Sequence, residues 1–387
     1  MSSTRRSFGL AASILLLAVA CAGPAATPTP APTAAPTAAP TAAPTAPMTH
    51  APMTHVKLQL QWVTQSQFAG YFAAVDQGFY ADEGLDVEIL QGAVDIVPQT
   101  VVASGSAEFG IAWLPKVLAS IEQGADLVNI AQVFQRSGTL EVAWATSGIN
   151  QPSDWRGKKV GTWGFGNEHE LFAAMRKVGI DPTNAADVTI VSQDFTMDAL
   201  LNNDLDAAEA MIYNEYAQVL EHNNPATGAL YQPADLSVIS MESAGTAMLQ
   251  DGIFAQSAWL NDPANADVAT RFLRASFKGW MWCRDNFDAC VQVVLNNGPT
   301  LGKGHQTWQL NEINGLIWPS PQGIGFMNGD AWAQTVRVAK EGQIITADPP
   351  QGAYRTDLAA AAWQGLDGDV NGNNYVKQNI TVTAGGN

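Results

Sequence analysis

Four aromatic side chains stand where four short apolar stretches of the sequence end. Trp62, Trp113 and Trp163 each follow one such stretch, and Tyr213 follows a fourth. Stacked aromatic rings gain about 0.5–1.5 kcal/mol beyond the burial of their surface, although large aromatic residues also fill ordinary cores. If the stretches are strands of open α/β sheets, their ends line the crevice where ligands bind. The four rings then predict a clamp for a flat molecule.

Polar residues flank these rings. Asn167 and Glu168 follow Trp163 at an expected helix start, where Glu168 either accepts hydrogen bonds from a ligand ring or is a first-turn carboxylate favoured by the helix dipole. Gln65 and Gln67 offer donors and acceptors that suit a uracil-like edge, or they are solvated loop residues. The candidate binding residues are Trp62, Gln65, Gln67, Phe68, Trp113, Trp163, Asn167, Glu168 and Tyr213.

Signatures of catalysis are missing from the sequence. It has no Gly-x-Ser-x-Gly motif, no phosphate-binding Gly-Lys-Ser/Thr loop and no His or Cys cluster at metal-ligand spacing. The formal net charge is −17, from 36 acidic and 19 basic residues, which argues against nucleic acid and anionic membrane surfaces as partners. We therefore expect no catalytic residue, no metal and no resident cofactor.

The first 55 residues predict export and tethering. Arg5 and Arg6 precede an apolar run of about ten residues, which suits a signal peptide and is too short to span a bilayer as a helix. Small residues then lead to Cys21, so residues 1–20 predict a lipoprotein signal peptide and Cys21 the lipidated residue; an ordinary signal peptide with an incidental cysteine is the alternative. Paired arginines leave the twin-arginine and general export routes both open.

Residues 21–55 are rich in Ala, Pro and Thr and predict an extended, polyproline-like spacer. Such a spacer behind a lipidated cysteine would hold a folded domain outside the cytoplasm, close to the cell membrane. The lipid anchor would be its only contact with that membrane.

From Val56 onward, short strands and helices alternate, which is typical of open, mostly parallel sheets flanked by helices. The run from residue 261 to 297 predicts an amphipathic helix pair, and residues 302–329, rich in Gly, Pro and Asn, predict an irregular surface segment. Strands are expected at residues 57–62, 85–90, 109–113, 127–133, 140–145, 159–163, 188–191 and 207–212, and helices at 68–79, 96–103, 168–178, 197–201 and 215–221.

Two cysteines, Cys283 and Cys290, remain in the folded part. In one unbroken helix their Cα atoms would lie about 10 Å apart, beyond the reach of a disulfide. The residues between them indicate a helix end, a turn and a new N-cap at Asp288, and this break makes a disulfide feasible. Two buried free thiols are the alternative.

The order of these segments resembles the type II periplasmic binding proteins. The opening Leu60-Gln61-Trp62, the stretch from Phe68 to Val87 containing Gln77-Gly78-Phe79-Tyr80-Ala81-Asp82-Glu83-Gly84-Leu85, the segment 102–110 and the segment 157–164 carry the resemblance. More narrowly, they resemble the branch that binds thiamine precursors and riboflavin and is related to the yeast thiamine-pyrimidine synthase.

The resemblance implies a two-lobed α/β fold in which two crossovers join the lobes, and it implies a permease and an ATPase of an ABC importer as partners of a monomeric binding protein. A hinge motion between such lobes encloses the ligand. The implied division is residues 56–148 with 245–345 as lobe 1, residues 149–244 as lobe 2, and residues 346–387 as a C-terminal extension.

One departure from the family bears on the ligand. Pyrimidine-binding relatives carry a histidine after the first strand in an Asn-His-x-Gly setting, whereas this chain has Gln67-Phe68-Ala69-Gly70. The cysteine-rich metal motif of the synthase is also missing, so we expect no enzyme. An aromatic residue in place of histidine favours riboflavin; a formylated aminopyrimidine is the first alternative. Sulfonates and other small nitrogenous solutes remain further alternatives, although few basic residues are present to bind a sulfonate.

Overall fold

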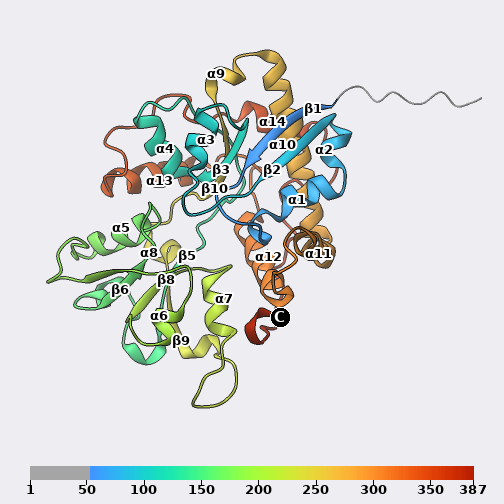
Figure 1. Cartoon of the computed structure of the whole chain (residues 1–387). Helices are drawn as coiled ribbons and strands as arrows, with labels where there is room; N and C mark the ends of the chain where they lie inside the picture. Colours follow the sequence, from blue (N-terminus) through green and yellow to red (C-terminus); the bar gives the residue numbers. More distant parts are fainter. Residues whose placement is uncertain (1–52) are drawn as a thin grey trace, which may run out of the picture. The chain divides into compact units, whose positions relative to one another are not determined.

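The computed structural model describes residues 53–387 (Figure 1). Cys21, the signal peptide and all but the last three residues of the expected spacer lie outside the described residues, so these assignments remain predictions. The first strand already begins at Thr54, so it includes the last two residues of the expected spacer. Among the helices from residue 53 onward, none is long and apolar enough to cross a membrane.

Within residues 53–387, ten strands form two five-stranded sheets, with the orders β2-β1-β3-β10-β4 and β7-β6-β8-β5-β9. In each sheet one strand runs against the other four, β10 in the first and β5 in the second. The sheets are therefore mixed, although most strands run in one direction, as expected. The strands are Thr54–Gln59 (β1), Leu85–Leu90 (β2), Phe109–Trp113 (β3), Val128–Gln132 (β4), Thr139–Trp144 (β5), Lys159–Thr162 (β6), Thr189–Ser192 (β7), Ala207–Met211 (β8), Leu236–Ser240 (β9) and Asp251–Ala255 (β10).

Helices cover both sheets (Figure 1). The longest, α10, packs along α1, α2 and α14 beside the first sheet. The helices are Ala69–Asp76 (α1), Phe79–Asp82 (α2), Pro98–Ala103 (α3), Leu114–Glu122 (α4), His169–Lys177 (α5), Asp198–Leu201 (α6), Glu215–Leu220 (α7), Met241–Ala244 (α8), Ser257–Leu260 (α9), Pro263–Asp285 (α10), Phe287–Asn297 (α11), Lys303–Ile317 (α12), Gly329–Glu341 (α13) and Asp357–Trp363 (α14).

The first crossover between the sheets lies earlier in the chain than the sequence indicated. β5 belongs to the second sheet, so the expected lobe boundary at residue 148 is wrong, and the first crossover lies between β4 and β5. The chain returns to the first sheet through β10, which inserts between β3 and β4. Strands β9 and β10 have no counterpart among the expected elements, because neither stretch shows a clear apolar alternation.

The first sheet and its helices share a core of stacked aromatic rings. Phe272 of α10 stacks on Phe109 of β3 with ring centroids 4.0 Å apart, and on Tyr80 of α2 at 5.4 Å. α1 and α10 approach so closely that a Cβ atom on Gly279 would lie 2.0 Å from the carbonyl oxygen of Gly70. A larger residue at either glycine would therefore separate the two helices.

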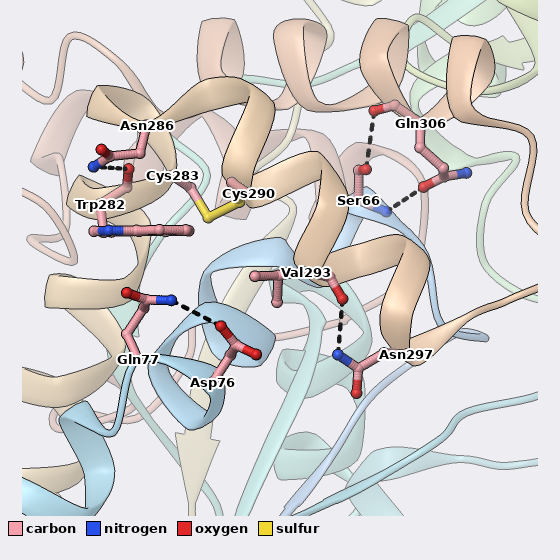
Figure 2. The surroundings of a disulfide bond; sticks show 10 residues. All are labelled: Ser66, Asp76, Gln77, Trp282, Cys283, Asn286, Cys290, Val293, Asn297 and Gln306. Carbon is pink, nitrogen blue, oxygen red and sulfur yellow. Dashed lines mark hydrogen bonds between the residues drawn. A yellow bond between two sulfur atoms is a disulfide. The ribbon is translucent and has the colours of Figure 1, made fainter.

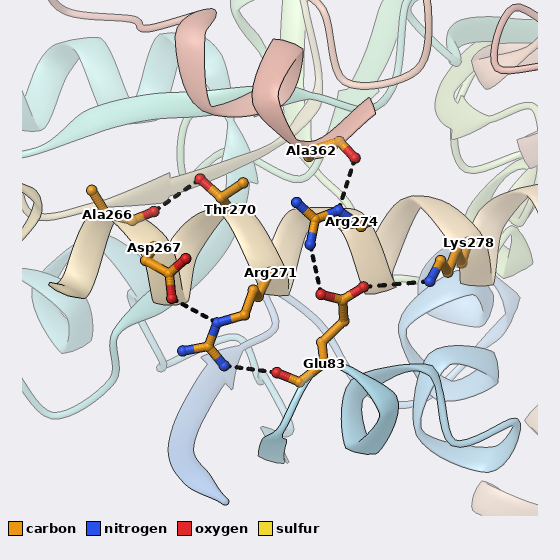
Figure 3. Close-up of polar contacts among 8 residues, drawn as sticks. All are labelled: Glu83, Ala266, Asp267, Thr270, Arg271, Arg274, Lys278 and Ala362. Atoms are coloured by element: carbon orange, nitrogen blue, oxygen red, sulfur yellow. Dashed lines mark hydrogen bonds and ion pairs between the residues drawn. The ribbon is translucent and has the colours of Figure 1, made fainter. Parts of the chain in front are cut away.

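Glu83, at the end of α2, ties the edge of this lobe to α10. Its carboxylate accepts a hydrogen bond from Arg274 at 2.6 Å and lies 3.4 Å from the ammonium group of Lys278 (Figure 3). Its carbonyl oxygen accepts a hydrogen bond from Arg271 at 2.7 Å. The stretch that carries the family resemblance here is therefore structural, since it fixes the turn that leads into β2.

The expected break between Cys283 and Cys290 is confirmed. α10 ends at Asp285 and α11 begins at Phe287, with Asn286 as the joint, so the expected N-cap at Asp288 is two residues too late. The turn brings the two Cα atoms to 5.0 Å, and the cysteines form a disulfide that joins the helices (Figure 2). Both cysteines are fully buried, and because their sulfur atoms are bonded to each other, the alternative of two buried free thiols is wrong.

Residues 302–329 are not the irregular surface segment that their composition indicated. α12 occupies half of this range, and it is bonded to both lobes. Its Gln306 carbonyl accepts a hydrogen bond from Ser66 at 3.0 Å in the first lobe, whereas its Trp308 ring N–H donates to the Ile212 carbonyl at 3.0 Å in the second. Gln306 and Gln309 of α12 are buried, and their side-chain oxygens accept hydrogen bonds from the Ser66 and Gln67 N–H groups.

The C-terminal extension is an integral part of the fold. α14 packs on α10, and Tyr354 forms a bridge with Asn129 of β4. Further on, the backbone of Gln378 exchanges two hydrogen bonds with the side chain of Asn311 in α12, both 2.9 Å. Finally, the Gly385 N–H donates to the Glu221 carbonyl of the second lobe at 3.0 Å.

Candidate ligand-binding site

A cavity of about 430 Å³ lies where the carboxyl ends of strands from both sheets meet. Residues after β1, β2 and β3 form one wall, and residues after β6, β7 and β8 form the other. This is the position in which open α/β sheets bind ligands, and the volume is within the range of small-molecule sites. The fold therefore brings the expected strand ends together around one space.

Seven of the nine expected residues line this cavity, namely Trp62, Gln65, Gln67, Trp113, Trp163, Asn167 and Tyr213. Phe68 does not, because the short 3-10 helix Ser66–Phe68 turns its ring into the first-lobe core, where it is fully buried. Glu168 does not either: its carboxylate accepts a hydrogen bond from the Gly166 N–H at 2.9 Å and stabilises the loop before α5. Both expectations are therefore corrected.

The aromatic residues form two opposing surfaces. Phe195, which follows β7, lies 4.7 Å from the ring of Trp62 in the first lobe. On its other side, Phe195 is nearly parallel to Trp163, with an interplanar angle of 14° and centroids 6.1 Å apart. Phe165 adds a largely exposed ring at the mouth of the cavity, 76% accessible. A flat ring can therefore contact aromatic faces from both lobes.

A chain of amides ends at a buried carboxyl group. Gln65 donates to Gln67 at 2.6 Å, and Gln67 donates to Asp251 at 2.9 Å. Gln61 donates to the other carboxyl oxygen of Asp251. Burial raises the pKa of Asp251 to about 7, against the opposing effect of these hydrogen bonds. These hydrogen bonds fix Gln65 and Gln67, which face the cavity, and they leave the side-chain oxygen of Gln65 available as an acceptor.

Lys116 supplies a cation in the cavity wall. Its ammonium group lies 5.1 Å from the centre of the Trp113 ring and donates to the side-chain oxygen of Asn167 at 2.9 Å. Burial lowers the pKa of Lys116, and the nearby Glu168, Glu209 and Asp251 oppose that shift. An ammonium group has three donors, so Lys116 can donate to a ligand acceptor while it connects α4 to the second lobe.

A second carboxyl group closes the far side of the cavity. Glu215 begins α7 and accepts hydrogen bonds from the Met211 N–H at 2.9 Å and from the Asn214 amide at 2.6 Å. Burial raises its pKa to about 7. Within residues 53–387, no group of His, Cys, Asp and Glu side chains has an arrangement that could hold a metal ion.

Several lining residues were missed by sequence reasoning. Lys116 lies one helical turn beyond Trp113, so the rule that ligands contact helix starts could have identified it. Phe165 and Phe195 also follow strands, but loops separate them from the strand ends. Asp251 gave no signal, because it opens a strand that lacks apolar alternation.

The profile of the family described as NMT1/THI5 like matches residues 65–289, more than half of the chain. This chain belongs to that family. The match covers all the lining residues except Gln61, Trp62 and Ile344, and it includes Asp251.

Individual relatives cover different parts of the chain. The riboflavin-binding protein RibY of Chloroflexus aurantiacus is 28% identical over 86% of this chain and 92% of its own length. The formylaminopyrimidine-binding protein of Halalkalibacterium halodurans is 24% identical over 62% of this chain and 70% of its own. A 4-amino-5-hydroxymethyl-2-methylpyrimidine phosphate synthase of Legionella pneumophila is 28% identical, but over only 35% of this chain.

The fold agrees with this assignment. The periplasmic aliphatic sulphonate binding protein SsuA of Escherichia coli superimposes with a TM-score of 0.57 over 81% of this chain and 94% of its own, at 16% identity. The expected two-lobed periplasmic-binding-protein fold is confirmed. At that identity the similarity concerns the fold and not the ligand.

Proposed function

We propose that this protein is the substrate-binding component of an ABC-type importer and that its ligand is riboflavin. The observation that carries the ligand assignment is the nearly parallel aromatic pair Trp163 and Phe195, which lines one cavity together with Trp62 of the other lobe. A planar ring system is the ligand chemistry that such a wall recognises, because stacking rewards flat, polarizable surfaces.

The spacing of the pair supports a ring between or beside its members. Carbon atoms in contact lie about 3.5–4.0 Å apart, so a ring sandwiched by two others needs roughly 7 Å between them. The centroids of Trp163 and Phe195 are 6.1 Å apart, and the distance between the ring planes cannot exceed this, so a sandwiched ring would part them by at least about 1 Å. Phe195 follows β7 in a loop, and a small shift there breaks no strand pairing.

The polar groups match the edge of such a ligand. Riboflavin has a uracil-like edge with acceptors and a donor, and a chain of hydroxyl groups. Lys116 can donate to a ring carbonyl of the ligand, and the side-chain oxygen of Gln65 can accept from a ring N–H. Glu215 and Asn214, at the other side, suit hydroxyl groups.

The formylated aminopyrimidine is the second candidate, supported by the relative that binds it. Three arguments favour riboflavin: the greater coverage of the riboflavin-binding relative, the cavity volume, and the absence of the histidine expected after the first strand of pyrimidine binders. A single small ring would leave part of the aromatic wall uncovered.

Export, lipidation at Cys21 and delivery to a permease with its ATPase belong to the same proposal. The Ala/Pro/Thr spacer would let a tethered monomer reach the transporter. Binding without turnover is also part of it, since the histidine expected for synthase chemistry has no equivalent.

Calorimetry of the purified protein with riboflavin and with the formylated aminopyrimidine, side by side, tests the ligand. We expect riboflavin to bind at least tenfold more tightly, a difference of about 1.4 kcal/mol. Tight binding of the pyrimidine without a response to riboflavin would overturn the ligand assignment and leave the importer role standing.

A further inference from the structure

Two glutamates face each other inside the second sheet. Glu141 of β5 is directly opposite Glu209 of β8, and their accessibilities are 1% and 0%. Among the described residues, neither oxygen of Glu141 has a hydrogen-bond partner, and one oxygen of Glu209 also lacks one. Opposite residues have Cβ atoms about 4.5–5.5 Å apart, so the two carboxyl groups are within reach of each other. Two negative charges in this dry space would repel strongly, which favours protonated carboxyl groups.

Glu209 also fixes the start of the aromatic wall. Its other oxygen accepts hydrogen bonds from the Thr162 hydroxyl at 2.6 Å and from the Trp163 N–H at 3.1 Å. Gln193 bonds to the N–H and the carbonyl of Glu209, at 2.9 and 2.8 Å. The ring N–H of Trp163 has no partner within residues 53–387, so the backbone and ring packing alone orient this side chain.

We propose that Glu209 is a positioning residue, which sets Trp163 for ligand binding, and that Glu141 keeps Glu209 in its protonated, neutral form. The expected effect on ligand affinity rests on the proposed function, whereas the expected protonation of Glu209 does not. A neutral carboxyl group accepts the two bonds from Thr162 and Trp163 without requiring water or a counter-ion.

Negative charges around Glu209 favour its protonated form, and one positive charge opposes them. Glu141 faces it from β5, Glu168 and Glu170 act from the start of α5, and Lys116 of α4 is the opposing cation. Burial raises the pKa of Glu209 to about 8, against the bonds from Thr162 and Trp163. Burial raises the pKa of Glu141 as well, and Glu209 adds to that shift.

Ionisation of Glu209 should therefore weaken ligand binding. A carboxylate at this position requires water, and the cavity lined by the neighbouring Trp163 is open space that can supply it. A bound ligand fills that space, so it favours the protonated form. Because ligand binding and protonation of Glu209 are then coupled, ligand affinity is highest below the pKa of Glu209. It falls as the pH rises through that pKa, by up to about tenfold per pH unit.

The first experiment uses no ligand. The backbone amide signal of Trp163, assigned in ¹⁵N-labelled protein, is followed from about pH 5 to pH 10. We expect a titration with a midpoint far above that of an ordinary glutamate, about 4.3. The titration should disappear in Glu209→Gln. Its midpoint should fall in both Glu141→Gln and Glu141→Leu, because each change removes the facing carboxyl group. It should fall further in Glu141→Gln, whose amide can donate to a carboxylate.

The second experiment measures riboflavin affinity by calorimetry over the same range. Glu209→Gln keeps the acceptor oxygen, so its affinity near pH 6 should be within about threefold of wild type, with no fall at high pH. Glu209→Leu should be at least about tenfold weaker at every pH, because Trp163 loses its bond. Asp206→Asn is the matched control: Asp206 accepts from the Lys159 N–H at 2.8 Å at the exposed end of the same strands, and this change should alter neither readout.

The outcomes separate the inference from the proposed function. A Trp163 amide that does not titrate, or that titrates identically in Glu209→Gln, overturns the inference whatever the ligand is. If wild-type protein binds no riboflavin while the Trp163 titration follows the three variants as expected, the proton assignment stands and the ligand assignment is wrong. Equal riboflavin affinity of Glu209→Leu and wild type at every pH overturns the positioning role.

Discussion

Replacing Trp163 with alanine is the most direct test of the aromatic wall. A tryptophan ring that covers one face of a ligand buries about 80–100 Å² of its own surface, worth roughly 2 kcal/mol at 25 cal/mol per Å². Stacking adds about 0.5–1.5 kcal/mol, but the ligand partly replaces the existing contact with Phe195, at 6.1 Å between centroids. We therefore expect a net loss of about 2 kcal/mol, roughly thirtyfold in riboflavin affinity.

Calorimetry gives the affinity, and titration with riboflavin should quench flavin and tryptophan emission together in wild type. Trp163→Phe keeps a flat ring and should stay within about fivefold of wild type, since part of the contact area remains. Trp332 is the matched control: it packs on Tyr354, away from the cavity, and Trp332→Ala should not change affinity. A loss of less than threefold in Trp163→Ala, with the fold intact, would refute the reasoning.

Three further outcomes are expected. The unfolding temperature should fall by several degrees from about pH 5.5 to pH 8.5. Burial raises the pKa of Asp251 and Glu215 to about 7, so their contribution to the free energy of unfolding is complete only below their unfolded-state pKa values and is lost as the pH rises. Scanning calorimetry that shows a rise instead would contradict this. Replacing Cys283 and Cys290 with alanine should lower stability by about 2–3 kcal/mol, the value for a short closed loop, in denaturant titrations; unchanged stability would argue against it. Cys21→Ser should release the exported protein from membranes without altering its unfolding, whereas a variant that stays in the membrane fraction would exclude lipidation at Cys21.

The sequence was informative wherever local patterning and burial coincide. Trp62, Trp113 and Trp163 were predicted as neighbours because strand ends converge in any open α/β fold. The break between Cys283 and Cys290 was predictable from turn-forming residues. In both cases the signal lies within about ten residues of the feature.

Long-range features were not predictable in this way. β5 was assigned to the wrong lobe because a crossover strand has the same alternation as its neighbours, and only pairing with β8 and β9 reveals its sheet. Phe68 was expected in the cleft because nothing in the sequence indicates the 3-10 turn before α1. α12 was missed because five of its nine buried residues are polar, so the sequence shows no continuous apolar stripe.

The last residues of the chain constrain how the lobes can part. A body joined by two neighbouring crossovers rotates freely about one axis, as a door does on its hinges. Here the tail is fastened to α12 through Asn311 and to the second lobe through Glu221, far along the chain from either crossover. These contacts limit the widest opening of the lobes, and they must break before the lobes separate further. A fluorophore placed at residue 387 would therefore report opening and closing of the lobes, whereas a bulky group fused there would keep the lobes partly open.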